Sequence, residues 1–495
     1  MLPHRIQVAG GGHHGIVTPV DPQRIRDSFA TDGPAVPAPS GLSLMPFQRG
    51  GVAFALRALA ESRACIIADD MGLGKTIQGL AVANRLGIAR FLVVCPAGLR
   101  INWQREAAKW LWWADAKIVG YEEAVRHPER TAGDWPLVIY DEAHYMKTPG
   151  SKRTQRGLAV TAQRKLFLSG TPIQNRPVEL WPILNAIDPG AWGSLNDYGV
   201  RYCAGKQVWK DVKFKRGAET IRKKVAEWDF SGASNLVELQ QRLRSTIMVR
   251  RMKAQVLKDL PAKVRQLIEF PAHAAGASPK LLAAVAKLWA NQKSAHSPEA
   301  VARLSDERRL LLEQIAKVRH EEALAKVRPS TQHIRDMLAS VDKVIVFAHH
   351  RDVMDAIMAD LSLDFKCVTL RGGMSDKAKQ AAVDEFQNGD ARAIIGQIQA
   401  AGVGWTLTAA STVIFVELDW VPGQMSQCED RAHRIGQLDS VLVQHLVIDG
   451  TLDARISHAL MRKQRVIDQA LNDAPASAEP LDEVEALALG EGSLP

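Results

Sequence analysis

The sequence predicts an α/β protein with two parallel-sheet units, and three observations support this fold class. Short apolar runs alternate with longer amphipathic segments from Leu42 to about Asp188. The alternation breaks over residues 190–338 and resumes over 338–455. The runs are uniformly apolar, as in strands buried on both faces of a parallel sheet. A chain of 495 residues is long enough for two or three such domains.

Nine apolar runs are the candidate strands. In the first unit they are "ACIIA" (64–68), "FLVVC" (91–95), "LVIY" (137–140) and "KLFLS" (165–169). In the second unit they are "KVIVFAHH" (343–350), "FKCVTL" (365–370), "RAIIGQ" (392–397), "TVIFVEL" (412–418) and "VLVQHLVI" (441–448). In the first unit a polar or glycine turn and then an amphipathic segment follow each run, a pattern typical of doubly wound sheets.

Composition divides the chain into four parts. We expect a flexible segment at 1–41, rich in Gly, Pro and Ala, and an acidic, disordered tail at 472–495. The first unit spans 42–262 and includes a basic insertion at about 190–262 that is expected to be mainly helical. The second unit spans 263–471 and includes a helical insertion at about 278–338.

The overall composition excludes several classes of protein. Hydrophobic residues make up 46% and charged residues 24%, as in ordinary globular proteins. No apolar run is long enough to cross a bilayer, so we expect no membrane association. The five cysteines are far apart and form no C-x-x-C pair, so neither a zinc ribbon nor a disulfide framework is indicated. We expect a monomer in a reduced compartment: the cytoplasm or nucleoid of a prokaryote or virus, or the nucleus of a eukaryote.

Positive charge is concentrated in one part of the chain. Between Gly205 and Arg265 there are sixteen Lys or Arg and six Asp or Glu, a balance of +10, whereas the whole chain carries +9. We call residues 205–265 the basic block. Such a block indicates a polyanionic partner, although a solvated helical face would have the same composition. Within it, Trp209 and Trp228 are expected to form the core of the insertion.

A candidate phosphate site lies in "ADDMGLGKTIQ" (68–78). The strict phosphate-loop pattern fits at Gly74, Lys75 and Thr76, but Asp69 stands where its first glycine belongs. A strand precedes this turn and a helix follows it, so backbone N–H groups would face phosphates, Lys75 would neutralise charge and Thr76 would hold Mg²⁺. A glycine-rich turn in another α/β enzyme is the alternative. The candidate ATP-binding residues are Asp70, Met71, Gly72, Leu73, Gly74, Lys75 and Thr76.

An acid pair supplies the second half of a nucleotide-hydrolysing site. In "PLVIYDEAH" (136–144), Asp141 would contact Mg²⁺ through water, and Glu142 would polarise the attacking water. The two acids follow a buried strand 65 residues downstream of Lys75, so an ordinary strand-end loop is a poor explanation for them. Together the two motifs indicate a phosphate loop of the variant that lacks the first glycine.

These motifs resemble the superfamily-two helicase core, and more narrowly the Swi/Snf-type DNA-translocating ATPases, over about residues 42–460. The resemblance implies two RecA-like lobes that close on ATP. In "LMPFQRGGVAF" (44–54) it implies that Gln48 reads the adenine edge. In "LSGTPIQNRPVELW" (168–181) it implies that Ser169, Gly170 and Thr171 couple the ATP site to the DNA site.

In the second unit, "QCEDRAHRIGQ" (427–437) is the most specific match. Gln427, Arg431 and Arg434 have i, i+4, i+7 spacing, which would put all three on one helical face. Arg431 and Arg434 would then reach across the cleft between the lobes to the γ-phosphate as arginine fingers, and Gln427 would belong to the ATP site.

Three longer strings narrow the resemblance to the annealing-helicase branch related to HARP, which rewinds or remodels DNA junctions. They are "WDFSGASNLVELQQRLRSTIMVRRMKAQVLKDLPAK" (228–263), "VIVFAHHRDVMDAI" (344–357) and "FVELDWVPGQMSQCEDRAHRIGQ" (415–437). Double-stranded or junction DNA is the expected partner. Arg250 and Arg251 would contact DNA or instead form internal salt bridges. The candidate DNA-contacting residues are Lys147, Lys213, Lys215, Arg250, Arg251 and Arg371.

We therefore expect a DNA-stimulated ATPase, using ATP and Mg²⁺, that translocates on duplex DNA and remodels junctions or DNA–protein complexes. One alternative is a helicase that unwinds RNA or DNA. Another is a nucleotide-dependent scaffold that binds DNA with little turnover. ATPase rates measured with different nucleic acids would separate the three.

Overall fold

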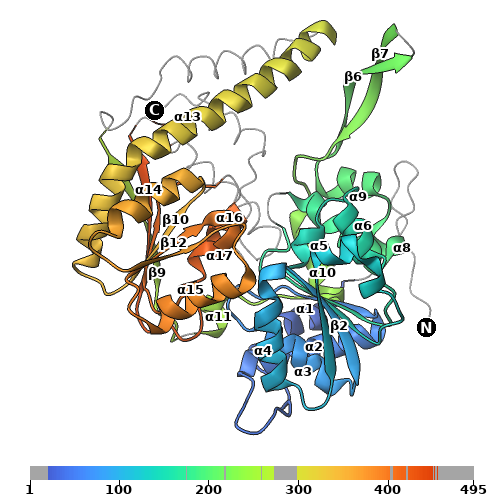
Figure 1. The fold of residues 1–495 in the computed structure, drawn as a ribbon. Coiled ribbons are helices and arrows are strands. Elements are labelled where there is room, and N and C mark those ends of the chain that lie inside the picture. Colours follow the sequence, from blue (N-terminus) through green and yellow to red (C-terminus); the bar gives the residue numbers. More distant parts are fainter. Residues whose placement is uncertain are drawn as a thin grey trace, which may run out of the picture.

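The computed structural model contains two lobes, each built on a parallel six-stranded sheet (Figure 1). The structure describes residues 20–173, 176–216, 219–257, 259–271, 298–401, 405–419, 422–449, 451 and 454. The predicted fold class, α/β with two parallel-sheet lobes, is confirmed. The acidic tail predicted at 472–495 lies outside the described residues.

In lobe 1 the strand order is β3-β2-β4-β5-β1-β8, and all pairings are parallel. The four predicted runs became β1, β2, β4 and β5, whereas β3 and β8 were not predicted. The strand bounds are β1 (Ala64–Ile67), β2 (Arg90–Cys95), β3 (Asp115–Gly120), β4 (Val138–Asp141), β5 (Lys165–Leu168) and β8 (Met248–Val249).

Helices flank this sheet and connect its strands. The α-helices are α1 (Pro22–Ser28), α2 (Pro46–Glu61), α3 (Lys75–Arg85), α4 (Arg100–Trp110), α5 (Tyr121–Arg126), α6 (Lys152–Leu158), α7 (Trp181–Ile187), α8 (Pro189–Trp192), α9 (Leu195–Tyr202), α10 (Leu236–Thr246) and α11 (Lys253–Val256). Short 3₁₀ turns are η1 (Ala97–Leu99), η2 (Pro128–Arg130), η3 (Ala143–Met146) and η4 (Pro177–Leu180).

The prediction of a flexible segment at 1–41 is wrong for its described part. Asp21 caps α1 by accepting from the backbone N–H of Gln23, and α1 packs against α10 and α2. Val36 and Ala38 pack against the apolar cluster beneath α2. Residues 20–41 therefore belong to lobe 1.

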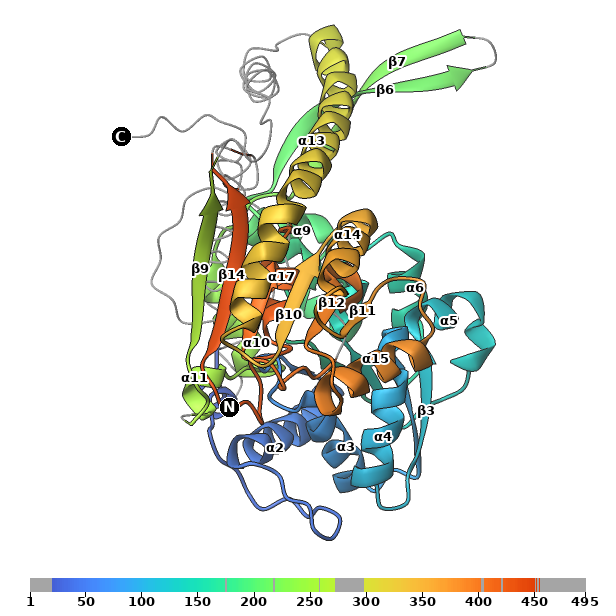
Figure 2. The same ribbon diagram turned by 60° about the vertical axis from the view of Figure 1, so that its left-hand side comes forward.

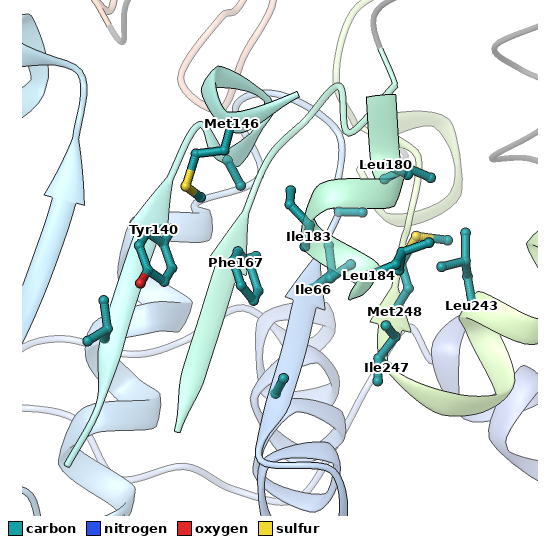
Figure 3. Packing of buried hydrophobic residues seen from close by; sticks show 14 of the residues in the cluster. Ile66, Tyr140, Met146, Phe167, Leu180, Ile183, Leu184, Leu243, Ile247 and Met248 are labelled. Carbon is teal, nitrogen blue, oxygen red and sulfur yellow. The ribbon is translucent and has the colours of Figure 1, made fainter. Parts of the chain in front are cut away.

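Apolar side chains cover both faces of the lobe 1 sheet, which explains why its strands are uniformly apolar. Ile66 faces one cluster, whereas its neighbours Cys65 and Ile67 face the other. Figure 3 shows the first cluster, where Phe167 of β5 and Leu184 of α7 lie near Ile66. Strand side chains alternate between faces, so strands covered on both sides need apolar residues at every position.

The basic insertion at 190–262 is not mainly helical, which corrects the prediction. Its centre is a hairpin of β6 (Lys206–Arg216) and β7 (Glu219–Asp229), paired antiparallel over eleven residues each. This hairpin projects from lobe 1 (Figures 1 and 2). Trp209 is 67% exposed, so the expectation that it is a core residue is wrong. The half-buried Trp228 stacks on Phe230.

In lobe 2 the strand order is β11-β12-β10-β13-β14-β9, again all parallel. The five predicted runs are present, and the unpredicted strand β9 pairs with β14 at the edge. The bounds are β9 (Lys263–Phe270), β10 (Val344–Ala348), β11 (Cys367–Leu370), β12 (Ala393–Gln397), β13 (Thr412–Phe415) and β14 (Val441–Ile448). The helices are α13 (Pro298–Leu338), α14 (Arg351–Leu361), α15 (Asp376–Asn388), α16 (Ile398–Ala401) and α17 (Pro422–Glu429).

Two features connect the lobes. The chain leaves the first sheet after β8 and enters the second sheet at β9, so residues 250–262 form the linker. The long helix α13 runs along lobe 2, and one part of it lies beside β6 of the hairpin (Figure 2). The predicted insertion at about 278–338 is helical over its described residues, 298–338.

Candidate active site between the lobes

The phosphate loop lies between β1 and α3, as the sequence predicted. Gly72 and Gly74 have φ of 83° and 74°, a conformation that favours glycine. Gly74 is the N-cap of α3, and no side chain caps that helix. Its first N–H groups are therefore available to an anion, which is how helix N-termini bind phosphate. Thr76 follows Lys75 in the first turn of α3.

The Lys75 ammonium group lies across the loop. It donates to the carbonyl oxygens of Asp69 and Asp70 at 2.8 and 3.1 Å. Burial lowers the pKa of Lys75, although Glu142 and other nearby carboxylates oppose the shift. A partly buried cation that donates to backbone carbonyl oxygens is a favourable site for phosphate oxygens.

The structure explains the missing first glycine. The Asp69 carboxylate is fully buried and forms an ion pair with the Arg251 guanidinium, whose Nε lies 2.8 Å from Oδ1. Gln78 of α3 donates to the same carboxylate at 2.9 Å. Asp69 therefore anchors the loop to the start of the linker, a function that glycine could not perform.

The acid pair ends strand β4 as predicted. Asp141 accepts from the indole N–H of Trp103 at 2.8 Å, and burial together with the charge of Glu142 raises the pKa of Asp141 to about 7. Burial acts to raise the pKa of Glu142, but His144 and the positive charges of Lys75 and Arg431 lower it overall. Glu142 has a φ of 50°, a strained conformation for this residue type, as found at functional sites. Glu142 is thus the carboxylate kept ionised.

A chain of polar contacts connects Glu142 to lobe 2. His144 Nδ1 lies 3.3 Å from Glu142 Oε2 and 3.1 Å from Ser169 Oγ. Ser169 Oγ accepts from the Thr171 N–H at 3.3 Å, and Gln427 of lobe 2 donates to Thr171 Oγ1 at 3.1 Å. The structure thus brings Ser169, Thr171 and Gln427 together. A Cβ on Gly170 would lie 2.4 Å from Met71 Cγ, so this segment packs tightly against the phosphate loop.

Arg431 and Arg434 face the phosphate loop, but not from a helix. The expected continuous helix is wrong, because α17 ends at Glu429 and both arginines follow in turns. A Cβ on Gly72 would lie 2.6 Å from Arg434 Cβ, which shows how closely the lobes approach. Arg434 donates to the Trp405 carbonyl at 3.1 Å. Burial lowers the pKa of both arginines, that of Arg434 to about 10.

Gln48 also lies at the phosphate loop. Its amide donates to the Leu73 carbonyl at 3.2 Å, and its oxygen accepts from the Met45 N–H at 2.9 Å. A Cβ on Gly74 would lie 2.4 Å from Gln48 Nε2. The predicted adenine contact stays a prediction, because these bonds place the side chain but show no base.

The residues present are suited to bind a nucleoside triphosphate together with Mg²⁺. Lys75, Arg431 and Arg434 are cations whose pKa values are lowered by burial, a state that an added polyanion would relieve. The described residues hold no group of three or more His, Cys, Asp or Glu suited to a metal. Proteins bind Mg²⁺ through one or two carboxylates, water and substrate phosphates, and the Asp141 carboxylate lies near the Lys75 ammonium group. Thr76 and Asp141 are the side chains that would hold it.

The candidate DNA-contacting residues fall into three groups. Arg250 and Arg251 are buried: Arg250 donates to the carbonyl oxygens of Ala68 and Gly170 at 2.6 and 3.0 Å. The prediction that Arg250 and Arg251 contact DNA is therefore wrong for this structure. The alternative, that both interact inside the protein, holds. Lys147 and Arg371 are partly exposed, near Glu179 (3.8 Å) and Asp355 (2.8 Å) respectively.

Lys213 and Lys215 lie on β6 of the projecting hairpin.

Two hollows between the lobes carry basic residues, of which sequence reasoning had named only Lys147. One, of about 560 Å³, is lined by Arg126, Lys147, Lys152 and Arg153 of lobe 1 and by Gln424 and Gln427 of lobe 2. The other, of about 350 Å³, is lined by Pro96, Ala97 and Gly98 of lobe 1 and by Arg351, Gly372 and Lys379 of lobe 2. Lone basic residues on helices carry no sequence signal of this kind.

Within the described part of the chain, no helix has the length and apolarity needed to span a membrane.

The geometry defines a class of protein: two parallel-sheet lobes, with a phosphate loop and acid pair in one and an arginine pair from the other. Residues 47–126 and 111–276 match the SNF2-related domain, and residues 329–436 match the Helicase conserved C-terminal domain. The chain belongs to the SNF2-related family; the first match covers lobe 1 and continues through β9, and the second lies within lobe 2. The resemblance to Swi/Snf-type ATPases is confirmed.

Named relatives agree with this family. The chain is 34% identical over 456 residues to the SWI/SNF-related matrix-associated actin-dependent regulator of chromatin subfamily A-like protein 1 of Xenopus tropicalis, covering 87% of this chain and 45% of that protein. It is 34% identical over 466 residues to the DNA annealing helicase and endonuclease ZRANB3 of Homo sapiens, covering 87% and 40%. The chain therefore spans less than half the length of these relatives.

Proposed function

We propose that this protein is a DNA-stimulated ATPase that translocates on double-stranded DNA and remodels DNA junctions or DNA–protein complexes. The observation that carries the proposal is the polar chain from Glu142 through His144, Ser169 and Thr171 to Gln427. It joins the hydrolytic acid of one lobe to the other lobe. A change at the nucleotide can therefore alter how the lobes meet, which a motor requires.

In the proposed mechanism each side chain has a defined role. The phosphate-loop N–H groups and Lys75 bind the β- and γ-phosphates of ATP. Glu142, ionised and held by His144, orients the attacking water and accepts its proton. Arg431 and Arg434 stabilise the charge that develops on the γ-phosphate. Mg²⁺, when bound near Thr76 and Asp141, would neutralise phosphate charge.

We propose that DNA lies along the basic hollows between the lobes and reaches the hairpin. Lys147, Lys152 and Arg153 line the larger hollow, whose other side belongs to lobe 2. Phosphate contacts from residues of both lobes would change when the lobes move, and such contacts are independent of base sequence. The hairpin residues 206–229 carry eight Lys or Arg and four Asp or Glu and would add further contacts. With DNA as partner, we expect a nuclear protein in a eukaryote and a cytoplasmic or nucleoid protein in a prokaryote.

The experiment is a set of ATPase assays without nucleic acid and with single-stranded, duplex and forked DNA and RNA. We expect the strongest stimulation by duplex or forked DNA. Glu142→Gln should bind ATP but not hydrolyse it, since an amide cannot accept the proton. Stimulation by RNA alone would favour a conventional RNA helicase, and DNA binding without turnover would favour a scaffold.

Translocation is tested separately by ATP-dependent displacement of the third strand of a triplex, with Arg434→Ala as the matched control. Arg434→Ala should lower turnover by about 10³-fold if the side chain acts as an arginine finger. Wild-type turnover in this variant would mean that lobe 2 does not complete the site.

A further inference from the structure

The linker between the lobes, residues 250–262, is fastened to the phosphate loop at its first end; together with Lys263, the first residue of β9, we call it the linker strap. The Arg251 carbonyl accepts from the Asp70 N–H at 2.9 Å, and the Arg251 guanidinium is paired with Asp69. The Lys253 N–H donates to the Asp70 carboxylate at 3.3 Å. Any movement of the phosphate loop therefore moves the backbone of Lys253.

The side chain of Lys253 crosses to lobe 2. Its ammonium group lies 2.9 Å from Asp430 Oδ1 and donates to the carbonyl oxygen of His433. Both side chains of the ion pair are buried, with 6% and 5% of their surfaces exposed. Asp430 directly precedes Arg431, and His433 directly precedes Arg434. Each of the two residues bound by Lys253 thus directly precedes one of the two arginines.

The second end of the linker strap holds the same turn. Lys263 lies 3.0 Å from Asp430 and 2.9 Å from Glu429, and His433 Nε2 lies 2.9 Å from the Pro261 carbonyl oxygen. These contacts lie at the edge of lobe 2 itself, because Lys263 begins β9. They explain how the turn is fixed within lobe 2, whereas Lys253 is also held to the phosphate loop, through its backbone N–H.

We propose that Lys253 is a positioning residue that sets the arginine turn 430–434 against the phosphate loop when the lobes are closed. The role rests on the proposed ATPase function, since the fingers matter only if the γ-phosphate is transferred. Lysine and arginine side chains carry only hydrogen-bond donors, so Lys253 acts on the two arginines through Asp430 and His433. An ion pair suits this task, because the buried Lys253 ammonium has its carboxylate partner in lobe 2, whereas Asp430 is also paired with Lys263.

The central test compares Lys253→Met with wild type in the full chain. Met keeps the length of the stem but removes the charge. We expect kcat for DNA-stimulated ATP hydrolysis to fall by about 10²-fold, the scale of a roughly 1 Å misplacement of catalytic groups. The KM for ATP should change little, because the phosphate loop remains intact. Lys253→Arg, which keeps the charge, should recover most of kcat, and Lys109→Met, on an exposed lysine, should match wild type.

A second readout does not depend on hydrolysis. Labels placed through Trp113→Cys and Leu363→Cys, both exposed and in different lobes, report the distance between the lobes. With a non-hydrolysable ATP analogue, wild type should give one narrow distance distribution and Lys253→Met a broader one. If wild type does not hydrolyse ATP, the proposed function fails, while this distance measurement still decides the role of Lys253.

Two results would overturn the proposal. One is a wild-type kcat and distance distribution in Lys253→Met. The other is a loss of kcat that tracks the melting temperature in all variants without rescue by Lys253→Arg, which would indicate a purely structural residue. If Lys253→Met does not fold, Lys253→Gln, which can still donate to Asp430, should have a kcat between those of Lys253→Ala and wild type.

Discussion

The two halves of the basic block have the same kind of composition and opposite structural roles. Residues 206–229 form a hairpin that projects from lobe 1. Residues 242–253 instead run through the interior, where Arg242, Arg244, Arg250, Arg251 and Lys253 are all buried. The first half remains a candidate DNA surface, and the second half joins the phosphate loop to the arginine turn. A local excess of positive charge therefore does not by itself identify a nucleic-acid surface.

The difference in burial between the two halves of the basic block follows from where carboxylates and carbonyl oxygens lie. Arg251 has Asp69 and Lys253 has Asp430, each far away in the sequence. Arg242 lies 4.4 Å from the Trp192 ring centroid and donates to the Tyr202 hydroxyl. Burial of a cation is tolerated only with such partners.

The largest expected effect comes from Arg251→Met, which should show that the second half stabilises the fold. It leaves the buried Asp69 carboxylate without its ion-pair partner, a change that typically costs about 3–5 kcal/mol. We expect this loss in the free energy of unfolding, measured by urea denaturation. Lys215→Met in the hairpin is the control and should stay within about 0.5 kcal/mol of wild type. Equal losses in both variants would remove the distinction between the halves.

The next effect is on DNA affinity. Reversal of Lys213, Lys215, Lys223 and Lys224 to Glu should weaken duplex binding by about 10²-fold and reduce the slope of log affinity against log salt by up to about 4, since each lost phosphate contact contributes about 0.9. The affinity for ATP should stay the same. Fluorescence anisotropy at several salt concentrations measures both quantities. An unchanged salt slope would place the DNA path away from the hairpin.

Arg244→Met tests a smaller interior contribution. Arg244 donates to Ser28 Oγ at 3.2 Å and to the Arg250 carbonyl at 3.0 Å, and its guanidinium lies 3.7 Å from the Phe29 ring centroid. We expect a loss of about 1–3 kcal/mol, the cost of leaving buried polar partners unsatisfied. Limited proteolysis should then cut near α1 sooner than in wild type. Resistance equal to wild type would mean that α1 is held by its apolar contacts alone.

The smallest effect is a change in acid stability at the end of the linker strap. Burial acts to raise the pKa of Glu429, but Lys263 and Arg265 outweigh it and lower the pKa to about 2. A carboxylate whose pKa is lowered by folding stabilises the fold at pH values above its pKa in the unfolded chain. It loses that contribution as the pH falls towards its pKa in the folded protein. Between pH 5 and 3 wild type should therefore lose about 1–2 kcal/mol through this group. Glu429→Gln should be less stable at pH 7 and less sensitive over that interval; parallel pH profiles would contradict this role.

Much of the fold and the hydrolytic centre could be predicted because their signals are local. The apolar runs that became β1, β2, β4 and β5 are short and uniform, and the phosphate loop and acid pair follow two of them directly. Edge strands carried weaker signals: β3 is "DAKIVG" and β9 is "KVRQLIEF", whose polar residues suit a partly solvated edge. In the hairpin, "DVKFK" (211–215) alternates polar and apolar residues, which is a strand signal, but the density of charge favoured a solvated helix in the prediction.

By itself the sequence determined the two α/β units, the glycine turn at 72–74 between a strand and a helix, and the place of Asp141 and Glu142 at a strand end. These rest on backbone periodicity and turn chemistry, which act over a few residues. The roles of Arg431 and Arg434 were inferred from the family resemblance and stay predictions. Only the tertiary structure decided that Arg251 is the partner of Asp69, that Lys253 joins Asp430, and that the arginines lie in turns after α17. The physical reason is that a charged residue is exposed or buried according to which opposite charge the fold brings to it, and those partners are separated by 182 and 177 residues in the chain.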